Sequence, residues 1–205
     1  MMEGFDTKAV NFYYFDAIKH EQYTKTITGE VTFGKPLESR YDTDAGFVWL
    51  DLLPESQWRV SISKFAVLQG KKGVLHDSIQ QFDVQTVRYA LIDSGCATIV
   101  LPTRIHQEFM KLFHEYSENP DISGMYLTPC YNREVIRSLR FVLDGKLIEI
   151  DGRELFQADP VNPEQCHLLV RGLDTKHVSL GVPFQRGFYT TFDYNRKQVG
   201  LARKL

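Results

Sequence analysis

The residues best placed to do chemistry are Asp93, Ser94 and Gly95, which follow an apolar run at residues 89–92 and precede another at residues 99–101. Removing a carboxylate from water at the end of a buried strand costs much free energy unless the carboxylate accepts hydrogen bonds there. Gly95 permits a tight turn whose backbone N–H groups reach back to the carboxylate, and a carboxylate held in this way can activate water. Asp, Ser and Gly are also ordinary turn residues, so these three alone favour a surface turn.

The other reactive side chains are three cysteines, Cys96, Cys130 and Cys166. An odd number leaves at least one thiol unpaired within the chain. A cysteine near a histidine can act as a nucleophile, but the six histidines are scattered without a catalytic pattern, so we interpret Cys96 as a small buried residue. Cys130 and Cys166 form either a disulfide or two free thiols, and their spacing alone does not decide between these. No Cys-x-x-Cys pair is present, so the sequence predicts no metal site and no cofactor.

Length and charge limit the number of domains and the kinds of partner that the chain can have. A chain of 205 residues can form one domain with a sizeable core. Its 24 basic and 26 acidic residues are nearly balanced, which argues against nucleic acid or an anionic membrane as the partner. No apolar run approaches the length of a membrane span.

Short strands separated by turn signals dominate the pattern and predict an all-β fold. Residues 58–62 alternate apolar and polar side chains, as in a strand with one wet face. Residues 139–150 carry Asp144 and Gly145 between two apolar runs, which predicts a hairpin with a type I′ turn. Residues 188–202 predict a second hairpin.

One segment has helical periodicity, from Thr103 as the N-cap to a stop at residues 119–120 (Asn-Pro). Its apolar residues recur at helical spacing: Ile105, Phe109, Leu112, Phe113 and Tyr116. We expect this stripe to face the core. Residues 70–85 are expected to form an exposed polar loop.

Several motifs, in this order, make the chain similar to the C-terminal lobe of a pepsin-like aspartic protease (family A1). Residues 28–34 resemble the strand that opens the lobe, and residues 58–62 a strand in which Trp precedes an alternating run. Residues 90–95 resemble the family's second catalytic motif, and residues 101–103 the Pro-Thr pair that follows it. Residues 187–202 resemble the closing hairpin.

This resemblance implies an all-β lobe with a psi-loop and one main helix. It divides the chain into residues 1–20, a linker and first strand region, and residues 21–205, the C-terminal lobe. A pepsin-like enzyme has two lobes and needs roughly twice the length of one domain, so the N-terminal lobe is expected to be absent. Any signal peptide is expected to belong to that missing part.

The resemblance also assigns roles at the loop. Asp93 is one of two catalytic aspartates, Ser94 holds the loop to the partner lobe through its hydroxyl, and Gly95 gives its N–H to the carboxylate. Leu180 and Gly181 belong to the apolar-apolar-Gly motif through which the catalytic loop threads.

The chain departs from the family at three positions. Cys96 stands where a Ser or Thr hydroxyl bonds the outer oxygen of the Asp, and a thiol is a weaker donor. Ser179 replaces an aliphatic residue of the psi motif, and Val182 stands where an Asp follows the Gly.

The family pairs the equivalents of Cys130 and Cys166 in a disulfide. A disulfide implies an oxidising, secretory-type route, and hence an extracellular or a lysosome- or vacuole-like location. The expected partners are the N-terminal lobe of the same parent protein, peptide or protein substrates and pepstatin-type inhibitors.

Peptide-bond hydrolysis by the parent protein is therefore the leading functional prediction, with the isolated chain inactive. The first alternative is a non-catalytic, peptide-binding or inhibitor-like module of the same fold. The second is a homodimeric protease in which two copies of Asp93 form the dyad.

Overall fold

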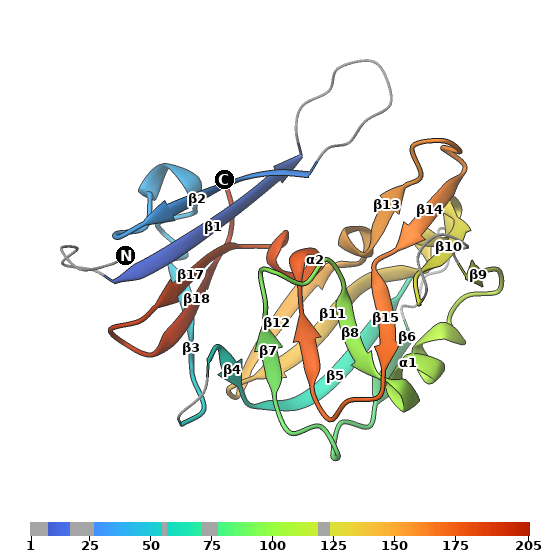
Figure 1. Ribbon diagram of the computed structural model, residues 1–205, viewed down its shortest axis with the longest axis horizontal. Helices are drawn as coiled ribbons and strands as arrows, with labels where there is room; N and C mark the ends of the chain where they lie inside the picture. Colours follow the sequence, from blue (N-terminus) through green and yellow to red (C-terminus); the bar gives the residue numbers. More distant parts are fainter. Residues whose placement is uncertain (1–7, 17–26, 55–56, 71–77, 119–123) are drawn as a thin grey trace.

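The computed structural model describes residues 8–16, 27–54, 57–70, 78–118 and 124–205. Within them the chain forms four β-sheets, two short α-helices and three 3₁₀ turns (Figure 1). The main helix is α1 (Thr103–Met110), and α2 (Val182–Gln185) is a single turn. The 3₁₀ turns are η1 (Glu38–Arg40), η2 (Cys130–Glu134) and η3 (Gly152–Leu155). The predicted all-β fold with one main helix is confirmed.

A five-stranded antiparallel sheet, here called the terminal sheet, joins strands from both ends of the chain and lies on the left of Figure 1. Its strands, in order, are β2 (Ile27–Phe33), β1 (Ala9–Asp16), β17 (Tyr189–Asp193), β18 (Gln198–Ala202) and β3 (Phe47–Asp51). The predicted closing hairpin is confirmed as β17 and β18. Its turn is fixed by the Asp193 carboxylate, which accepts hydrogen bonds from the N–H groups of Asn195 and Arg196, both at 2.9 Å.

A second five-stranded sheet, here called the psi sheet, mixes parallel and antiparallel pairs. Its order is β15 (Val170–Leu173), β8 (Ile99–Pro102), β16 (Val178–Leu180), β7 (Ala90–Ile92) and β4 (Arg59–Val60). The neighbours β16 and β7 run parallel, whereas β8 runs antiparallel to β16. Side chains of β7, β8 and β16 are almost all buried, as expected for short, uninterrupted apolar runs.

A four-stranded sheet packs behind the psi sheet, in the order β12 (Lys146–Asp151), β11 (Ile136–Leu143), β5 (Ile62–Gln69) and β6 (Ser78–Phe82) (Figure 1). The hairpin between β11 and β12 turns at Asp144 and Gly145 with φ of 47° and 71°, which confirms the type I′ prediction. Phe65 and Phe141 lie opposite each other and stack at 4.9 Å.

The prediction of an exposed loop at residues 70–85 is wrong at Ser78–Phe82, because these residues form strand β6. Phe82 is buried and stacks on Phe65 at 4.8 Å, so apolar packing draws this segment onto the sheet edge. Residues 71–77 lie outside the described part of the chain.

The predicted strand at residues 58–62 is divided between two sheets. Trp58 has φ of 55°, and the strand begins only at Arg59. Val60 pairs with Ala90 of the psi sheet, whereas Ile62 pairs with Leu143 of the sheet behind it. The chain changes sheets between these two positions, which periodicity alone does not reveal.

The helix prediction is correct at its start and wrong at its end. Pro102 is the N-cap and makes no side-chain cap, while Thr103 is the first helical residue. The buried stripe includes Ile105 and Phe109, but the helix ends at Met110 instead of near residue 118.

Tertiary hydrogen bonds hold the chain that follows this early end. The carbonyl of Glu115 accepts bonds from Thr128 Oγ1 at 2.7 Å and Asn132 Nδ2 at 3.3 Å. The following residues enter a small sheet ordered β13 (Phe156–Ala158), β14 (Gln165–Leu168), β10 (Tyr126–Pro129) and β9 (Ser117–Glu118). The predicted stop at residues 119–120 lies outside the described residues.

A disulfide joins Cys130, at the start of η2, to Cys166 in β14, with a Cα–Cα distance of 5.0 Å. This confirms the expected pairing and leaves Cys96 as the free cysteine.

We expect the double substitution Cys130→Ser and Cys166→Ser to lower the free energy of unfolding by roughly 4 kcal/mol, because the loop between the two residues is then free in the unfolded chain. Urea unfolding measures the loss. Cys96→Ser is the matched control, because it removes a cysteine and leaves the disulfide loop closed. Mass mapping of non-reduced peptides tests the pairing itself. Complete alkylation of both thiols in oxidised protein would refute it.

Candidate active site

Asp93 lies where two parallel strands end side by side. Ile92 closes β7 and Leu180 closes β16, and the two residues are in register. The backbone N–H of Asp93 donates to the carbonyl of Leu180 at 3.2 Å. The strand ends therefore fix the start of the Asp-Ser-Gly turn at one end of two interior strands of the psi sheet.

The carboxylate of Asp93 is held by its own turn. The N–H of Gly95 donates to Asp93 Oδ1 at 2.9 Å, and the N–H of Cys96 donates to the Asp93 carbonyl at 3.2 Å. The side chain is partly exposed, and Oδ2 has no hydrogen-bond partner within the described residues. One oxygen is thus fixed by the backbone while the other remains available to water.

Gly181 lets the second strand pass close to this loop. The N–H of Val182 donates to the Cys96 carbonyl at 2.8 Å. A Cβ built on Gly181 would lie 2.2 Å from the carbonyl oxygens of both Cys96 and Thr98. The backbone at Gly181 is extended, with φ of −82°, so contact distance, not conformation, requires a glycine here.

The thiol of Cys96 turns away from Asp93. Its Sγ donates to the carbonyl of Thr98 at 3.2 Å and lies 3.8 Å from Thr98 Oγ1. Cys96 is only partly buried, so its interpretation as a small buried residue is corrected: it lies in a turn between the exposed residues Gly95 and Ala97. Sequence reasoning missed Thr98, whose signal was limited to a polar residue directly before an apolar run.

A pocket of about 150 Å³ opens beside Asp93 and Ser94. The rest of its lining comes from four segments: Val10, Phe12, Trp58, Ile92, Phe192 and Tyr194. Trp58 meets Phe192 and Tyr194 edge-on, at 4.8 and 4.7 Å between ring centroids. The hydroxyl of Ser94 makes no hydrogen bond to another described residue. An apolar wall therefore flanks the carboxylate on the side of the terminal sheet.

Most of this wall was not identified as a site from the sequence. The sequence places Trp58 and Phe192 in strands and Tyr194 in a hairpin turn, and it predicts no role for Val10 and Phe12. The alternation in β1 places Val10 and Phe12 on one face, which was the available signal.

Two histidines, His106 and His114, lie on or just after α1, and they share no ligand cluster. In the part of the chain that the structure describes, no group of three or more His, Cys, Asp or Glu residues could hold a metal ion. His106 is buried, and this burial lowers the pKa of its imidazole below the usual value. None of the helices among these residues is long and apolar enough to cross a membrane.

Comparison with known proteins decides the family. The family model of the eukaryotic aspartyl proteases matches residues 9–204. The chain belongs to this family.

Individual aspartyl proteases are related only distantly. Plasmepsin IV of Plasmodium falciparum (isolate 3D7) is 29% identical over 118 residues, which cover 55% of the chain and 25% of that protein. Renin of Rattus norvegicus is 27% identical over 119 residues, 55% of the chain and 29% of the relative. Pepsin B of Canis lupus familiaris is 22% identical over 211 residues, 98% of the chain and 48% of the relative. The chain thus spans at most about half the length of these relatives.

Two of the three departures from the aspartyl protease pattern lie on the psi motif. Ser179 is 7% exposed and lies between Leu91 and Val100 of the neighbouring strands. Val182 begins α2 and keeps its backbone bond to Cys96. Neither substitution interrupts the backbone pairing that positions Asp93, so the loop geometry survives both.

Proposed function

We propose that this chain is the C-terminal lobe of an aspartic endopeptidase, with Asp93 as one of its two catalytic aspartates. The observation that carries the proposal is the Asp93 carboxylate, held by the Gly95 N–H at the end of parallel strands and open to water on its other oxygen. Membership of the eukaryotic aspartyl protease family supports it. The lobe comprises residues 21–205, after a linker and first strand region at residues 1–20.

Hydrolysis in such an enzyme needs two carboxylates that share one proton and one water molecule. Two carboxylates at this separation do not both ionise, and the resulting pKa values belong to the pair. One carboxylate takes a proton from water while the other donates to the substrate carbonyl. In the proposed enzyme Asp93 supplies one carboxylate, and the N-terminal lobe of the same parent protein supplies the other.

The remaining partners follow from this assignment. Ser94 has a hydroxyl free of other described residues, and we assign it to the contact with the N-terminal lobe. The substrates are peptides or proteins, and pepstatin-type inhibitors bind across the dyad. The disulfide of Cys130 and Cys166 supports a secretory route, ending outside the cell or in a lysosome- or vacuole-like compartment.

We expect the isolated chain to leave acid-denatured haemoglobin uncleaved, because a single Asp93 cannot form a dyad. The assay is peptide release at about pH 3 to about pH 5, near carboxyl pKa values, with intact pepsin B as the positive control. Circular dichroism and sedimentation establish that the chain is folded and monomeric. Pepstatin-sensitive cleavage by monomers would contradict the proposal, and cleavage by dimers would replace it with the homodimeric protease.

A non-catalytic module of the same fold is the second candidate, and one observation favours it. The Cys96 thiol bonds the Thr98 carbonyl and gives no support to the outer oxygen of Asp93. The sequence of the parent protein upstream of this chain separates the two candidates. An Asp-Thr-Gly or Asp-Ser-Gly motif there supports the enzyme, and its absence supports the module.

A further inference from the structure

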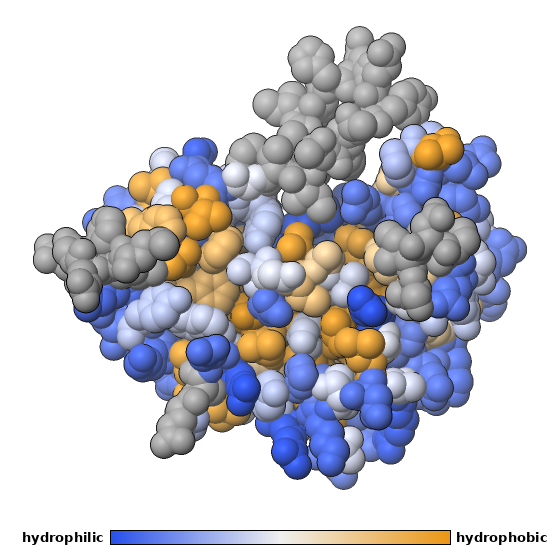
Figure 2. Space-filling model, in the orientation of Figure 1, coloured by the Kyte–Doolittle hydropathy of each residue, from blue (hydrophilic) through white to orange (hydrophobic). Residues whose placement is uncertain are grey.

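A second, larger pocket lies at the end of the psi sheet opposite to Asp93. Because β7 and β16 run parallel, the residues that precede them lie together at the end away from Asp93 and Gly181. The end of β8 joins them, since β8 runs antiparallel to β16. In Figure 1 these loops form the lower edge of the molecule, and in Figure 2 that lower edge is coloured hydrophilic.

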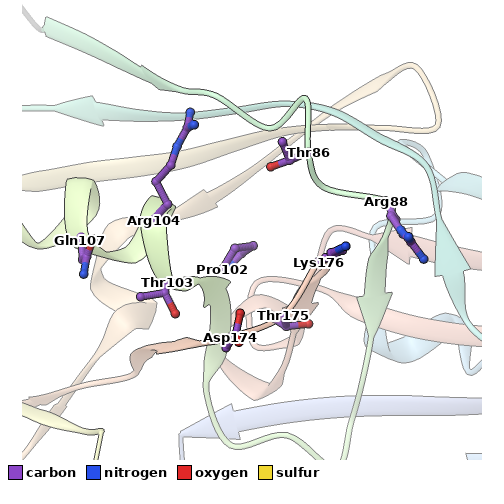
Figure 3. A pocket seen from close by; sticks show the side chains of 9 residues that line it. All are labelled: Thr86, Arg88, Pro102, Thr103, Arg104, Gln107, Asp174, Thr175 and Lys176. Atoms are coloured by element: carbon purple, nitrogen blue, oxygen red, sulfur yellow. The ribbon is translucent and has the colours of Figure 1, made fainter.

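This pocket has a volume of about 630 Å³ and is open to solvent. Three segments line it: Thr86 and Arg88 before β7; Pro102, Thr103, Arg104 and Gln107 at the start of α1; and Asp174, Thr175 and Lys176 before β16. In Figure 3, Gln107, Thr103 and Arg104 lie on one side of the pocket and Arg88 on the other, with Asp174 and Lys176 between them.

The charges of this pocket are only partly compensated. Arg104 is paired with Asp83. The exposed side chains of Arg88, Lys176 and Asp174 have no ion-pair or hydrogen-bond partner within the described residues. The pocket therefore presents two cations and one carboxylate that have no direct partner within the described residues.

The volume and the mixed charges of the pocket favour some classes of ligand over others. A single inorganic anion would occupy a small fraction of the volume, and a dense polyanion would bring negative charge against Asp174. A peptide with acidic side chains carries carboxylates for Arg88 and Lys176, and its backbone N–H groups are donors that Asp174 can accept. The hydroxyls of Thr86 and Thr103 add further partners for a peptide backbone.

We propose that this pocket binds an acidic polypeptide segment, with its carboxylates at Arg88 and Lys176 and its backbone N–H groups at Asp174. The site is separated from Asp93 by the length of β7, about 10 Å for three residues, so binding does not require the catalytic carboxylate.

Fluorescence anisotropy with a labelled peptide of alternating Asp and Gly tests the proposal at low salt. We expect the full chain to bind the Asp-Gly peptide and to show no binding to the uncharged Asn-Gly peptide. The double substitution Arg88→Gln and Lys176→Gln is expected to weaken binding at least about 10-fold, through loss of two charge-assisted contacts. The matched control is Lys64→Gln with Arg203→Gln, which removes the same charges from exposed positions outside the pocket.

An equal loss in both double variants would overturn the proposal, since net charge alone would then explain the binding. Calorimetry with inorganic phosphate provides the second test. Phosphate that binds as tightly as the peptide would replace the peptide site with a simple anion site. Because neither measurement involves proteolysis, a negative result leaves the proposed role of Asp93 untouched.

Discussion

In the proposed two-lobed enzyme, replacing Asp93 with Asn is expected to abolish proteolysis and preserve the fold. Asn retains the shape of Asp and an oxygen that accepts the Gly95 N–H, which lies 2.9 Å from Oδ1. The backbone bond from residue 93 to the Leu180 carbonyl does not involve the side chain. The turn should therefore form as before.

The chemical loss should be large because an amide cannot share the proton of the dyad. The pair then lacks the base that takes a proton from water, and we expect turnover to fall by about 10³-fold or more. The measurement is turnover of a fluorogenic peptide between about pH 3 and about pH 7, a range that brackets ordinary carboxyl pKa values. Circular dichroism reports whether the variant is folded.

Asp51→Asn is the matched control for this experiment. It makes the same chemical change on an exposed residue of β3, whose carboxylate accepts only from Gln198 in the described contacts. We expect its turnover to equal that of the parent protein. A folded Asp93→Asn protein with normal turnover would remove Asp93 from catalysis and make the non-catalytic module the better proposal.

The sequence was most informative where backbone constraints act over a few residues. The Asp144-Gly145 turn, the closing hairpin and the turn from Asp93 to Gly95 were each predicted from local residue types, and each has the expected geometry. The psi motif around Gly181 was predicted from its resemblance to the apolar-apolar-Gly motif of the family. Its physical reason, the approach of two carbonyl oxygens, became visible only in three dimensions.

Features that depend on distant residues were the ones missed. The chain that follows α1 is held by Thr128 and Asn132, which donate to the Glu115 carbonyl, and helical periodicity contains no information about these contacts. The wall beside Asp93 combines Phe12 with Tyr194, from opposite ends of the chain. Such sites require the strand order of the terminal sheet, which a single sequence does not provide.

Gly181→Ala is expected to have a large effect on folding. The added methyl group would lie 2.2 Å from two backbone carbonyl oxygens, and neither can rotate away as a side chain could. Relief requires β16 to separate from the Asp93 loop, which breaks the bonds from Asp93 to Leu180 and from Val182 to Cys96. We expect a loss of more than about 4 kcal/mol in the free energy of unfolding, the range reserved for severe steric or network disruption.

Gly145→Ala separates this steric effect from the general cost of replacing glycine. Gly145 has φ of 71°, and a Cβ there meets nothing within 4 Å, so its substitution should cost only about 1 kcal/mol of backbone strain. Urea unfolding of both variants measures the difference, and pepstatin binding by the full-length protein reports whether the loop keeps its shape. If Gly181→Ala is no less stable than Gly145→Ala and still binds pepstatin, then the close contact between Gly181 and the Asp93 loop is not what positions Asp93.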